Sequence, residues 1–597
     1  MQALRSKGVG KANVRVRVVV WALALGFCLT ATAQAEQPAN AACTAWHSLT
    51  DTQLQQFDFH ATGETTHRQL AWPQAGAEYV LGEVRFIRQN VFPDRNHWLA
   101  RQANRFNTLT RETALKAAFV INPGETVTEI KRQEAERELR NKAFLYDARI
   151  LVRQLCGNRV DLDIVVRDVW TLTPGIGVTR SGGDNETSVT LSDVNFLGSG
   201  KSLSVEYFDD VDRSGTFFRF DDPNIRGSRW QGRLVLADND DGERYGAALS
   251  RPFYALDTPW TAGFSVDHEV RDQDLEFLGK DQFEIRAKVD SADIFVGRSS
   301  GRSSGPFGGP SGGQEGGWIN RYFAGVRYLH EEFTYPSDFP GPLEDERKFI
   351  YPYIGWSLIE ERFDTRTDVD RVGIVEDINL GWNFFAELGW SPEALGGIGD
   401  QLLMRAAASH RQYLGQGHLL SFAARFRSRY DLEENQTQDL RLTGRLSYLW
   451  QQSDKWRFFA SLDYTQTRNL PLDVQLTLGG DDGLRGYPTR YQIGDRSALA
   501  TVEQRYYSSA YPFGLFRVGY AVFVDVGRAW FEDEPPAWVP PRSGDHFGTL
   551  SNVGLGLRLE SVRTRRDRLV HIDFAKPLVD GPFVDSWEFT VTAKQSF

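Results

Sequence analysis

Three residues in the C-terminal part of the sequence have the types and spacing for ionic chemistry. Arg485 lies in a glycine-rich stretch, LGGDDGLRGYPTRYQIGD, at residues 478–495. Glu503 and Asp525 follow, each on the polar side of a segment that alternates apolar and polar residues. Two carboxylates that face the inside of a barrel repel each other unless a cation joins them, and the planar fork of arginine can serve both, which lysine cannot. The residue types leave a second interpretation equally open, in which Arg485 is a solvated loop charge.

No arrangement of residues indicates catalysis or a bound metal. The sequence contains no HExxH motif and no phosphate-binding loop, and its G-x-S-x-G matches all fall in the glycine- and serine-rich stretch at residues 297–317. The acidic stretch ADNDDG at residues 237–242 lacks the spaced ligands of an EF-hand and is interpreted as a turn. The histidines considered as candidates are scattered along the chain: His47, His60, His67, His97 and His268. We therefore expect no enzyme activity, no metal and no cofactor, and a structural or conformational role for Arg485.

The first 35 residues have the pattern of a cleaved export signal. A basic start is followed by the apolar run VVVWALALGFCL at residues 18–29 and by the small-residue site Ala33-Gln34-Ala35. The alternative, a membrane-anchoring helix, is disfavoured because the run is short for a membrane span. Together with the membrane barrel and the family resemblance described below, the signal leads us to expect a location in the bacterial outer membrane, with the N-terminal domain in the periplasm.

The charge and hydropathy of the mature chain exclude two classes of protein. Removing the five basic residues of the signal from 68 Lys and Arg leaves 63 against 79 Asp and Glu, a net charge of −16. This acidity argues against nucleic-acid binding, which uses basic surfaces. After the signal no apolar run approaches the ~18 residues of a transmembrane helix, whereas the strands of a membrane β-barrel alternate and escape a hydropathy scan.

Residues 36–75 are polar and weakly patterned, and we interpret them as an N-terminal extension. Cys43 and Cys156 are the cysteines left after cleavage of the signal. In an oxidising compartment they could pair and staple the extension to the next domain, or remain two free thiols. No histidine cluster accompanies them, so a zinc site is not expected.

Residues 76–170 are predicted to form one small α/β domain. A strand is predicted at residues 79–88 and a short helix at 111–119. A T-x-x-E capping box, Thr126 with Glu129, predicts the start of a second helix. Two strands then flank the turn signal Cys156-Gly157-Asn158. The predicted order is strand, helix, helix, strand, strand.

From residue 171 to 597 short segments of period two follow one another. In the segment at 516–530 Val518, Tyr520, Val522, Val524 and Val526 share one face. A soluble sandwich also alternates, but these segments number about twenty, and aromatic residues (Trp450, Trp530, Trp587) lie near segment ends as in the girdles of membrane barrels. The last segment ends on Phe597, and the glycine- and serine-rich stretch at 297–317 is predicted to be a flexible loop. We predict a closed antiparallel transmembrane β-barrel, which leaves no strand edge in lipid.

Several motifs resemble the superfamily of bacterial outer-membrane assembly factors and two-partner secretion transporters. The quoted LRGY, Leu484, Arg485, Gly486 and Tyr487, resembles its (V/I)RG(F/Y) signature, and FVDVG, from Phe523 through Asp525 to Gly527, resembles its F-x-D-x-G strand signature. Glu503 matches the acidic residue of the strand between them, and stretches such as DDPNIRG and IDFAKPL resemble other phrases of the family. The α/β domain resembles a POTRA (polypeptide-transport-associated) domain. The resemblance implies that the loop enters the barrel lumen, where Arg485 would reach Asp525 and Glu503.

The resemblance also implies a function and a strand number. It implies sixteen strands, whereas the count of alternating segments reaches about twenty. It implies an insertase or translocase that captures exported polypeptides or outer-membrane protein precursors at the POTRA domain, in contact with outer-membrane lipid and possible accessory periplasmic proteins. A dedicated two-partner secretion transporter and a passive diffusion porin are the alternatives. The single POTRA-like domain departs from the two that secretion transporters usually carry and from the five of the general assembly factor.

Overall fold

A computed structural model describes residues 43–59, 72–91, 107–306, 317–340, 346–367, 369, 375–510, 512, 516–561 and 569–594. The predicted export signal and Phe597 lie outside the described residues. None of the described helices is long and apolar enough to cross a membrane.

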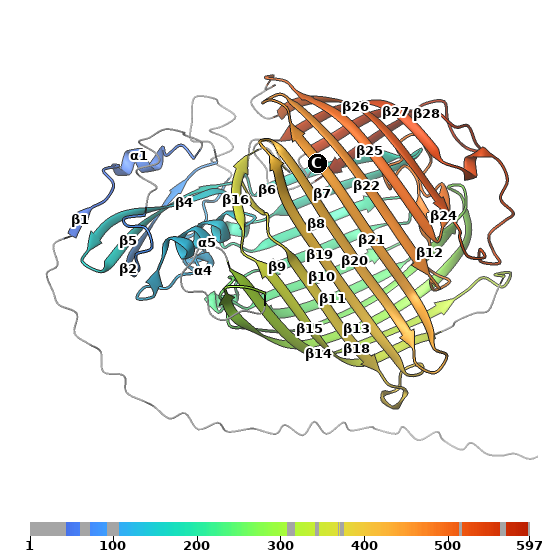
Figure 1. The fold of residues 1–597 in the computed structure, drawn as a ribbon, viewed down its shortest axis with the longest axis horizontal. Coiled ribbons are helices and arrows are strands. Elements are labelled where there is room, and N and C mark those ends of the chain that lie inside the picture. The colour runs from blue at the N-terminus through green and yellow to red at the C-terminus, as the bar shows by residue number, and fades with distance from the viewer. Residues whose placement is uncertain are drawn as a thin grey trace, which may run out of the picture. The chain divides into compact units, whose positions relative to one another are not determined.

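Twenty antiparallel strands close into one barrel (Figure 1). The predicted fold class, a closed antiparallel barrel preceded by a small α/β region, is confirmed. The strand number agrees with the count of alternating segments, and the sixteen strands implied by the resemblance are wrong. The strands are β6 (Leu172–Ser181), β7 (Asp184–Asp193), β8 (Ser202–Asp209), β9 (Ser214–Asp222), β10 (Gln231–Asn239), β11 (Gly242–Arg251), β12 (Trp260–Glu276), β13 (Asp281–Ser303), β14 (Trp318–Thr334), β15 (Glu346–Glu360), β18 (Asn383–Ser391), β19 (Gln401–Gly415), β20 (His418–Asp431), β21 (Gln436–Gln451), β22 (Trp456–Arg468), β25 (Arg496–Tyr507), β26 (Phe516–Trp530), β27 (Leu550–Ser561), β28 (Leu569–Pro577) and β29 (Glu588–Lys594).

The motifs near the C-terminus could not reveal the full strand number. They cover the 478–495 loop and the five strands that follow it, β25 to β29. Fifteen strands precede the loop, and their number depends on which segments pair in the ring. The loop predicted at 297–317 starts too early, because β13 continues to Ser303.

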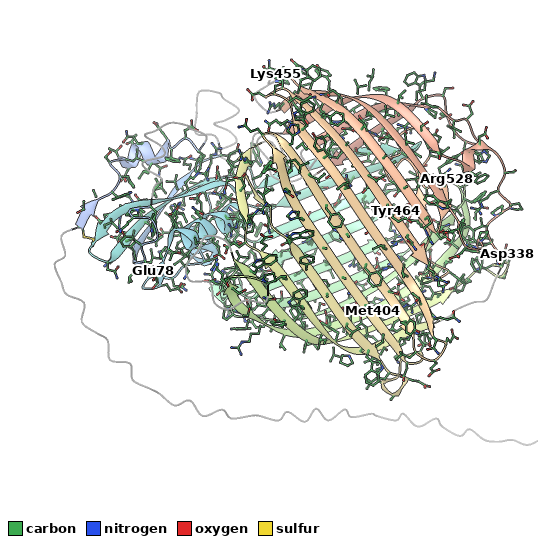
Figure 2. All side chains as sticks on the ribbon, in the orientation of Figure 1. Glu78, Asp338, Met404, Lys455, Tyr464 and Arg528 are labelled. Atoms are coloured by element: carbon green, nitrogen blue, oxygen red, sulfur yellow. A yellow bond between two sulfur atoms is a disulfide. The ribbon has the colours of Figure 1, made fainter. Side chains whose placement is uncertain are left out.

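The alternation along the strands places large apolar side chains on the outside of the barrel. Ile176, Ile354 and Leu555 are 82%, 66% and 62% exposed, respectively. Figure 2 shows Met404 and Tyr464 on the outer face of the tilted strands. An apolar surface of this extent is unfavourable in water and matches the lipid-facing band of a membrane barrel.

One junction of the barrel is much weaker than the others. Among the described residues, the last strand, β29, pairs with the first, β6, through a single residue pair, Val591 with Arg180. At every other junction of the ring the described strands pair over seven or more residues, as for β28 and β29 from Leu569↔Lys594 to Ala575↔Glu588. The described residues therefore pair least at the β29–β6 junction.

The N-terminal α/β region is a five-stranded sheet of order β1-β4-β5-β2-β3 with helices packed on it. The central strands are kept in place by a buried apolar core that includes Leu81, Leu115, Leu139, Ile150 and Ile164. Its elements are β1 (Cys43–Ala45), α1 (Asp51–Gln55), β2 (Tyr79–Gln89), α4 (Glu112–Ala118), β3 (Thr126–Val127), α5 (Glu129–Arg140), β4 (Leu145–Cys156) and β5 (Arg159–Asp168). Among the 3₁₀ turns in the barrel connections are η1 (Phe196–Gly198), η2 (Ile225–Gly227), η3 (Glu393–Leu395) and η5 (Asp545–Phe547).

Helix α5 begins at a different cap from the predicted one. The side chain of Thr128 accepts a hydrogen bond from the Lys131 amide, which makes Thr128 the N-cap. The predicted capping box of Thr126 and Glu129 is wrong because Thr126 belongs to β3, which pairs with β2. Both threonines suit a cap by type, and only the strand pairing distinguishes them.

The described part of the N-terminal extension adds a strand to the sheet. Strand β1 pairs antiparallel with β4, with Cys43 opposite Cys156, and the two cysteines form a disulfide. Two short hairpins lie outside the barrel ring. They are formed by β16 (Phe363–Thr367) with β17 (Val375–Asn379), and by β23 (Leu476–Leu478) with β24 (Gln492–Gly494).

Candidate functional site

The 478–495 loop, between β22 and β25, folds back on itself above the β23–β24 stem. The Gly480 amide donates to the Pro488 carbonyl at 3.0 Å, and the Leu484 amide donates to the Gly479 carbonyl at 2.9 Å. Gly483 has a φ of +109°, which glycine adopts without steric penalty. These contacts present Arg485 at the tip of the fold.

Arg485 is buried among three carboxylates on three strands. Its Nε and Nη2 donate to the two oxygens of Asp525 on β26, both at 2.8 Å. Its Nη1 donates to Glu503 on β25 at 2.7 Å and to Asp573 on β28 at 3.1 Å. The side chain is 8% exposed, so the guanidinium lies away from bulk water. A bidentate pair plus two further charge-assisted bonds is a geometry that only arginine supplies.

Two further arginines and two neutral side chains complete this cluster. Arg505 donates to Glu503 at 2.7 Å, and Arg558 donates to Asp573 and Glu503. Asn552 and Thr501 donate to Asp525 at 2.8 and 2.9 Å. We refer to the six charged residues Arg485, Arg505, Arg558, Glu503, Asp525 and Asp573 as the arginine network. With all six ionised it carries equal positive and negative charge, which is how buried charges are tolerated.

Sequence reasoning did not predict Asp573, Arg558 or Arg505 as members of the network. Strand β28 follows the alternation of a barrel strand, since Phe574 faces outward at 51% exposure while Asp573 is buried. The alternation alone would have placed Asp573 inside the barrel. That it reaches Arg485 follows from the pairing of β27 with β28, which is a tertiary fact.

The other motif residues shape the contact surface between the loop and the barrel wall. The ring of Phe523 lies under the guanidinium, 3.3 Å from Arg485 Cζ to the ring centroid, which explains an apolar residue on the polar side of β26. A Cβ on Gly486 would lie 2.6 Å from Asn552 Cβ, and one on Gly527 would lie 3.1 Å from Leu478 and Leu499. Both glycines therefore allow close approach of the loop to the wall.

Leu484 and Tyr487 anchor the loop on either side of Arg485. Both are fully buried in an apolar cluster that also contains Tyr491, Leu499 and Leu550. The Tyr487 hydroxyl donates to the Ser551 carbonyl at 2.9 Å. The apolar anchors and the ionic network hold the same tetrapeptide.

The loop also contacts the strands on the other side of the β29–β6 junction. Thr489 donates to Asp184 of β7, and Gly480 packs against Gly182 in the β6–β7 turn. Arg490 bonds Glu276 of β12 at 2.6 Å and Asp212 at 2.8 Å. Because Arg485 bonds β28, the loop joins the two flanks of the weak junction.

The described residues form no group that resembles a catalytic or metal centre. No cluster of three or more His, Cys, Asp or Glu side chains within them is arranged to hold a metal ion. His47 contacts Asp163 at 3.2 Å, where Arg85 also bonds the carboxylate, and His268 contacts Asp290 at 2.7 Å. The site can clamp strands together, and nothing in its geometry activates a nucleophile.

Comparisons with known proteins show a distant likeness to outer-membrane barrels. No protein-family profile and no curated protein matches the sequence. Among solved structures, BamA from Haemophilus ducreyi lacking POTRA domains 1-3 aligns at 14% identity and a TM-score of 0.38, over 86% of this chain and 84% of its own. CdiB from Acinetobacter baumannii aligns at 12% identity and a TM-score of 0.41, over 86% and 73%. CdiB from Escherichia coli aligns at 11% identity and a TM-score of 0.33, over 90% and 94%. At these values the likeness carries no argument, and the fold assignment depends on the strand pairing described above.

Proposed function

We propose that this protein is an outer-membrane insertase or translocase for exported polypeptides. The observation that carries the proposal is that a buried loop bridges a weakly paired junction of the barrel. A barrel made only to be a pore gains nothing from an opening in its wall, because every strand edge exposed to lipid costs free energy. An insertase needs such an edge, since a client strand can pair with it and enter the bilayer sideways.

The arginine network supplies the means to control that opening. Arg485 holds β25, β26 and β28 on one flank, while Thr489 contacts β7 on the other. The single pair between Val591 and Arg180 contributes little by comparison. In this proposal the loop keeps the barrel closed at rest, and a client strand replaces the missing pairing when it opens.

The α/β region would capture clients by adding their strands to its sheet. Strand β1 already binds β4 in this way, so the sheet accepts an added strand. The next part of the β4 edge is occupied, because Glu136 and Arg132 bond the amide and carbonyl of Ile150. We propose that β2 offers the client edge, since beyond Val80 the described strands pair with it only on its β5 side.

Depletion of the protein in cells tests the proposal. The outer-membrane and secreted proteomes are compared with and without the protein, and a set of exported clients is expected to fall in the membrane or the medium. Cells that express the chain without residues 36–170 should lose the same clients, because capture is lost while the barrel remains. Unchanged proteomes in both experiments would remove the proposal.

A diffusion porin is the rival from a different class. In planar bilayers a porin gives a steady, open, solute-selective current, and deletion of the α/β region has no effect in cells. That pair of results would replace the insertase with the porin. Loss of one secreted protein alone would favour a dedicated two-partner transporter.

A further inference from the structure

A wall of the barrel lumen is strongly basic. Strands β19, β20, β21, β22 and β25 are neighbours in the ring, and their outward faces carry apolar residues such as Phe422, Leu446 and Leu462. The alternate, lumen-facing positions hold nine arginines against four carboxylates, Asp431, Asp439, Asp463 and Glu503. We refer to the nine arginines as the basic track: Arg405, Arg411, Arg425, Arg427, Arg429, Arg441, Arg445, Arg457 and Arg505.

The strand register places several of these arginines directly opposite one another. Arg427 is paired with Arg405 on one side and with Arg441 on the other. Arg457 is paired with Arg505. Like charges at directly opposed positions of an antiparallel pair destabilise a sheet, and the barrel carries three such pairs in one wall. At least one arginine of each pair also meets a carboxylate: Arg427 bonds Asp439 at 3.1 Å, Arg405 lies 3.8 Å from Glu387, and Arg505 bonds Glu503 at 2.7 Å.

The track runs from one end of the barrel to the other. Arg411 lies near the β19–β20 turn, at the same end as Arg457 and Arg505. Arg425 and Arg445 lie in the middle of their strands, and the row of Arg405, Arg427 and Arg441 lies toward the β20–β21 turn. Arg429, Arg457 and Arg505 are buried, so an extended chain in the lumen would meet the other arginines of the track, Arg411, Arg425, Arg445, Arg405, Arg427 and Arg441.

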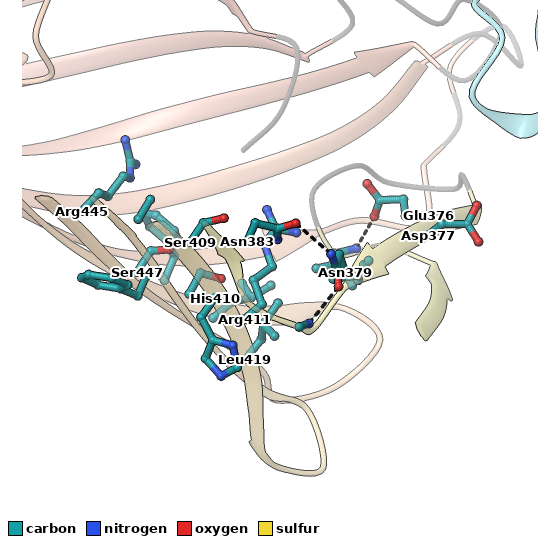
Figure 3. Close-up of a pocket in the computed structure, with 18 of the residues that line it drawn as sticks. Glu376, Asp377, Asn379, Asn383, Ser409, His410, Arg411, Leu419, Arg445 and Ser447 are labelled. Carbon is teal, nitrogen blue, oxygen red and sulfur yellow. Dashed lines mark hydrogen bonds between the residues drawn. The ribbon is translucent and has the colours of Figure 1, made fainter. Parts of the chain in front are cut away.

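A cavity of about 720 Å³ opens onto the middle of the track. Figure 3 shows Arg445, Ser409 and Ser447 on the wall strands and Asn379 of β17 across from them. Arg425 also lines this cavity; its side chain is exposed to the lumen and makes no hydrogen bond or ion pair with any described residue. The two carboxylates of the lining are engaged, Glu376 by the Val369 amide and Asp377 by Arg140. The cavity thus offers cations and hydroxyl groups to an incoming anion.

We propose that the basic track binds an extended polypeptide segment rich in Asp and Glu. The proposal rests on the function proposed above, which supplies polypeptides as clients, and it names the kind of segment that enters the lumen. Carboxylates pair with arginine through charge-assisted hydrogen bonds, and every second residue of an extended chain faces the same wall. Glu186 on β7 and Glu206 on β8 lie about half-way round the ring and would repel the same segment, which directs it to the track.

Binding of an acidic peptide to the purified full chain tests the proposal. The probe is fluorescein-labelled decaglutamate, about 33 Å long when extended, which is close to the thickness of the hydrocarbon core. Fluorescence anisotropy is expected to show binding that weakens as salt is raised, while decalysine does not bind. The Arg425→Ala/Arg445→Ala variant should bind roughly tenfold or more weakly, the loss expected for charge-assisted hydrogen bonds.

The matched control removes two arginines from the other side of the lumen. Arg233→Ala/Arg244→Ala on β10 and β11 has the same change in net charge and should keep the affinity of the unsubstituted protein. The heat-modifiable gel migration of each variant verifies that its barrel is folded. Equal affinity in the track variant and the control, or binding of polyphosphate in place of decaglutamate, would overturn the proposal.

This experiment separates the track from the proposed function. It uses purified protein and needs no client in cells. Peptide binding with unchanged proteomes on depletion would leave the track as a binding site and remove the insertase. Altered proteomes without peptide binding would support the insertase and remove the track as a binding site.

Discussion

At the scale of residues, the arginine network accounts for the unusual composition of the 478–495 loop. Burial of three carboxylates would be prohibitive without cations, and Arg485, Arg505 and Arg558 supply them. Arg485 is the only one of the three carried by the loop, so the ionic contacts of the loop with β25, β26 and β28 depend on it. The glycines around it are needed because the backbone approaches the wall closely.

We expect Arg485→Ala to destabilise the folded barrel by roughly 3–5 kcal/mol, because it leaves buried carboxylates unpaired. Arg485→Lys should also destabilise it, since an ammonium cannot bond Asp525 with two parallel bonds and reach Glu503 as well. The temperature at which the folded barrel loses its faster gel migration measures both. Arg298→Ala is the control, because Arg298 is exposed and makes no ion pair with any described residue. Full heat stability in both Arg485 variants would contradict a structural role for the network.

A substitution that leaves the charge unchanged tests how closely the loop packs against the barrel wall. Gly486→Ala places a methyl group 2.6 Å from Asn552 Cβ and 3.2 Å from the Pro577 nitrogen, so the loop must shift. We expect a lower transition temperature in the same assay, by the equivalent of about 1–3 kcal/mol. Gly444→Ala on β21 meets no atom within 4 Å and should leave the temperature unchanged. If the two variants behave alike, the loop is not packed as described.

At the scale of elements, helix α5 is fastened to strand β4 by a buried carboxylate. Glu136 bonds Arg132 and Arg149 at 3.1 Å each and also accepts from Arg140 and from the Ile150 amide. Burial alone would raise the pKa of Glu136, but Arg140, Arg132 and Arg149 outweigh it and lower the pKa to about 2. The ionised form is therefore the one that the folded state favours.

This pKa predicts how the α/β region responds to acid. Because the pKa is lowered from 4.5 to about 2, the contribution of Glu136 is present above about pH 4.5 and is lost as the pH falls toward 2. The shift corresponds to about 3 kcal/mol. Hydrogen–deuterium exchange of α5 and β4 in the full chain, corrected for intrinsic rates, should rise between about pH 7 and about pH 3. Glu136→Gln should show the faster exchange already at neutral pH, and identical exchange in both proteins would contradict the prediction.

At the scale of the whole molecule, closure of the barrel is uneven. Nineteen junctions of the ring are strand pairs of ordinary length, and the junction of β29 with β6 is a single pair. Strand pairing between described residues is therefore least extensive where the two ends of the barrel sequence meet, and the 478–495 loop contacts both sides of this junction. In the proposed function the ring opens at this junction while its other strand pairs stay intact.

Joining the junction covalently should abolish function. Arg180 and Val591 are directly opposed, so Arg180→Cys/Val591→Cys can form a disulfide across it. Under oxidising conditions we expect client levels in the outer membrane to fall to those of depleted cells, with recovery after reduction. Leu555→Cys/Phe574→Cys joins the well-paired strands β27 and β28 and is the control that should retain activity. Normal client insertion by the cross-linked junction would exclude lateral opening.

The sequence by itself determined the features that depend on local periodicity. Alternation along residues 516–530 assigned Val522 and Val524 to the outside and Asp525 to the inside, because successive side chains of a strand point to opposite faces. The same reasoning predicted the order of β2, α4, α5, β4 and β5, but it did not predict β1, α1 or the two-residue strand β3. Local pattern could not distinguish Thr126 from Thr128 as the cap of α5, because the answer depends on the pairing of β3 with β2.

Only the tertiary structure decided which inward-facing groups meet. Asp573 lies 88 residues from Arg485 in the chain, and their contact exists because β28 follows β27 in the ring and the loop folds back toward both. The twenty-strand closure and the opposed arginines of the basic track depend in the same way on register between distant segments. Side-chain alternation is encoded within a few residues, whereas pairing partners are selected by the free energy of the whole ring.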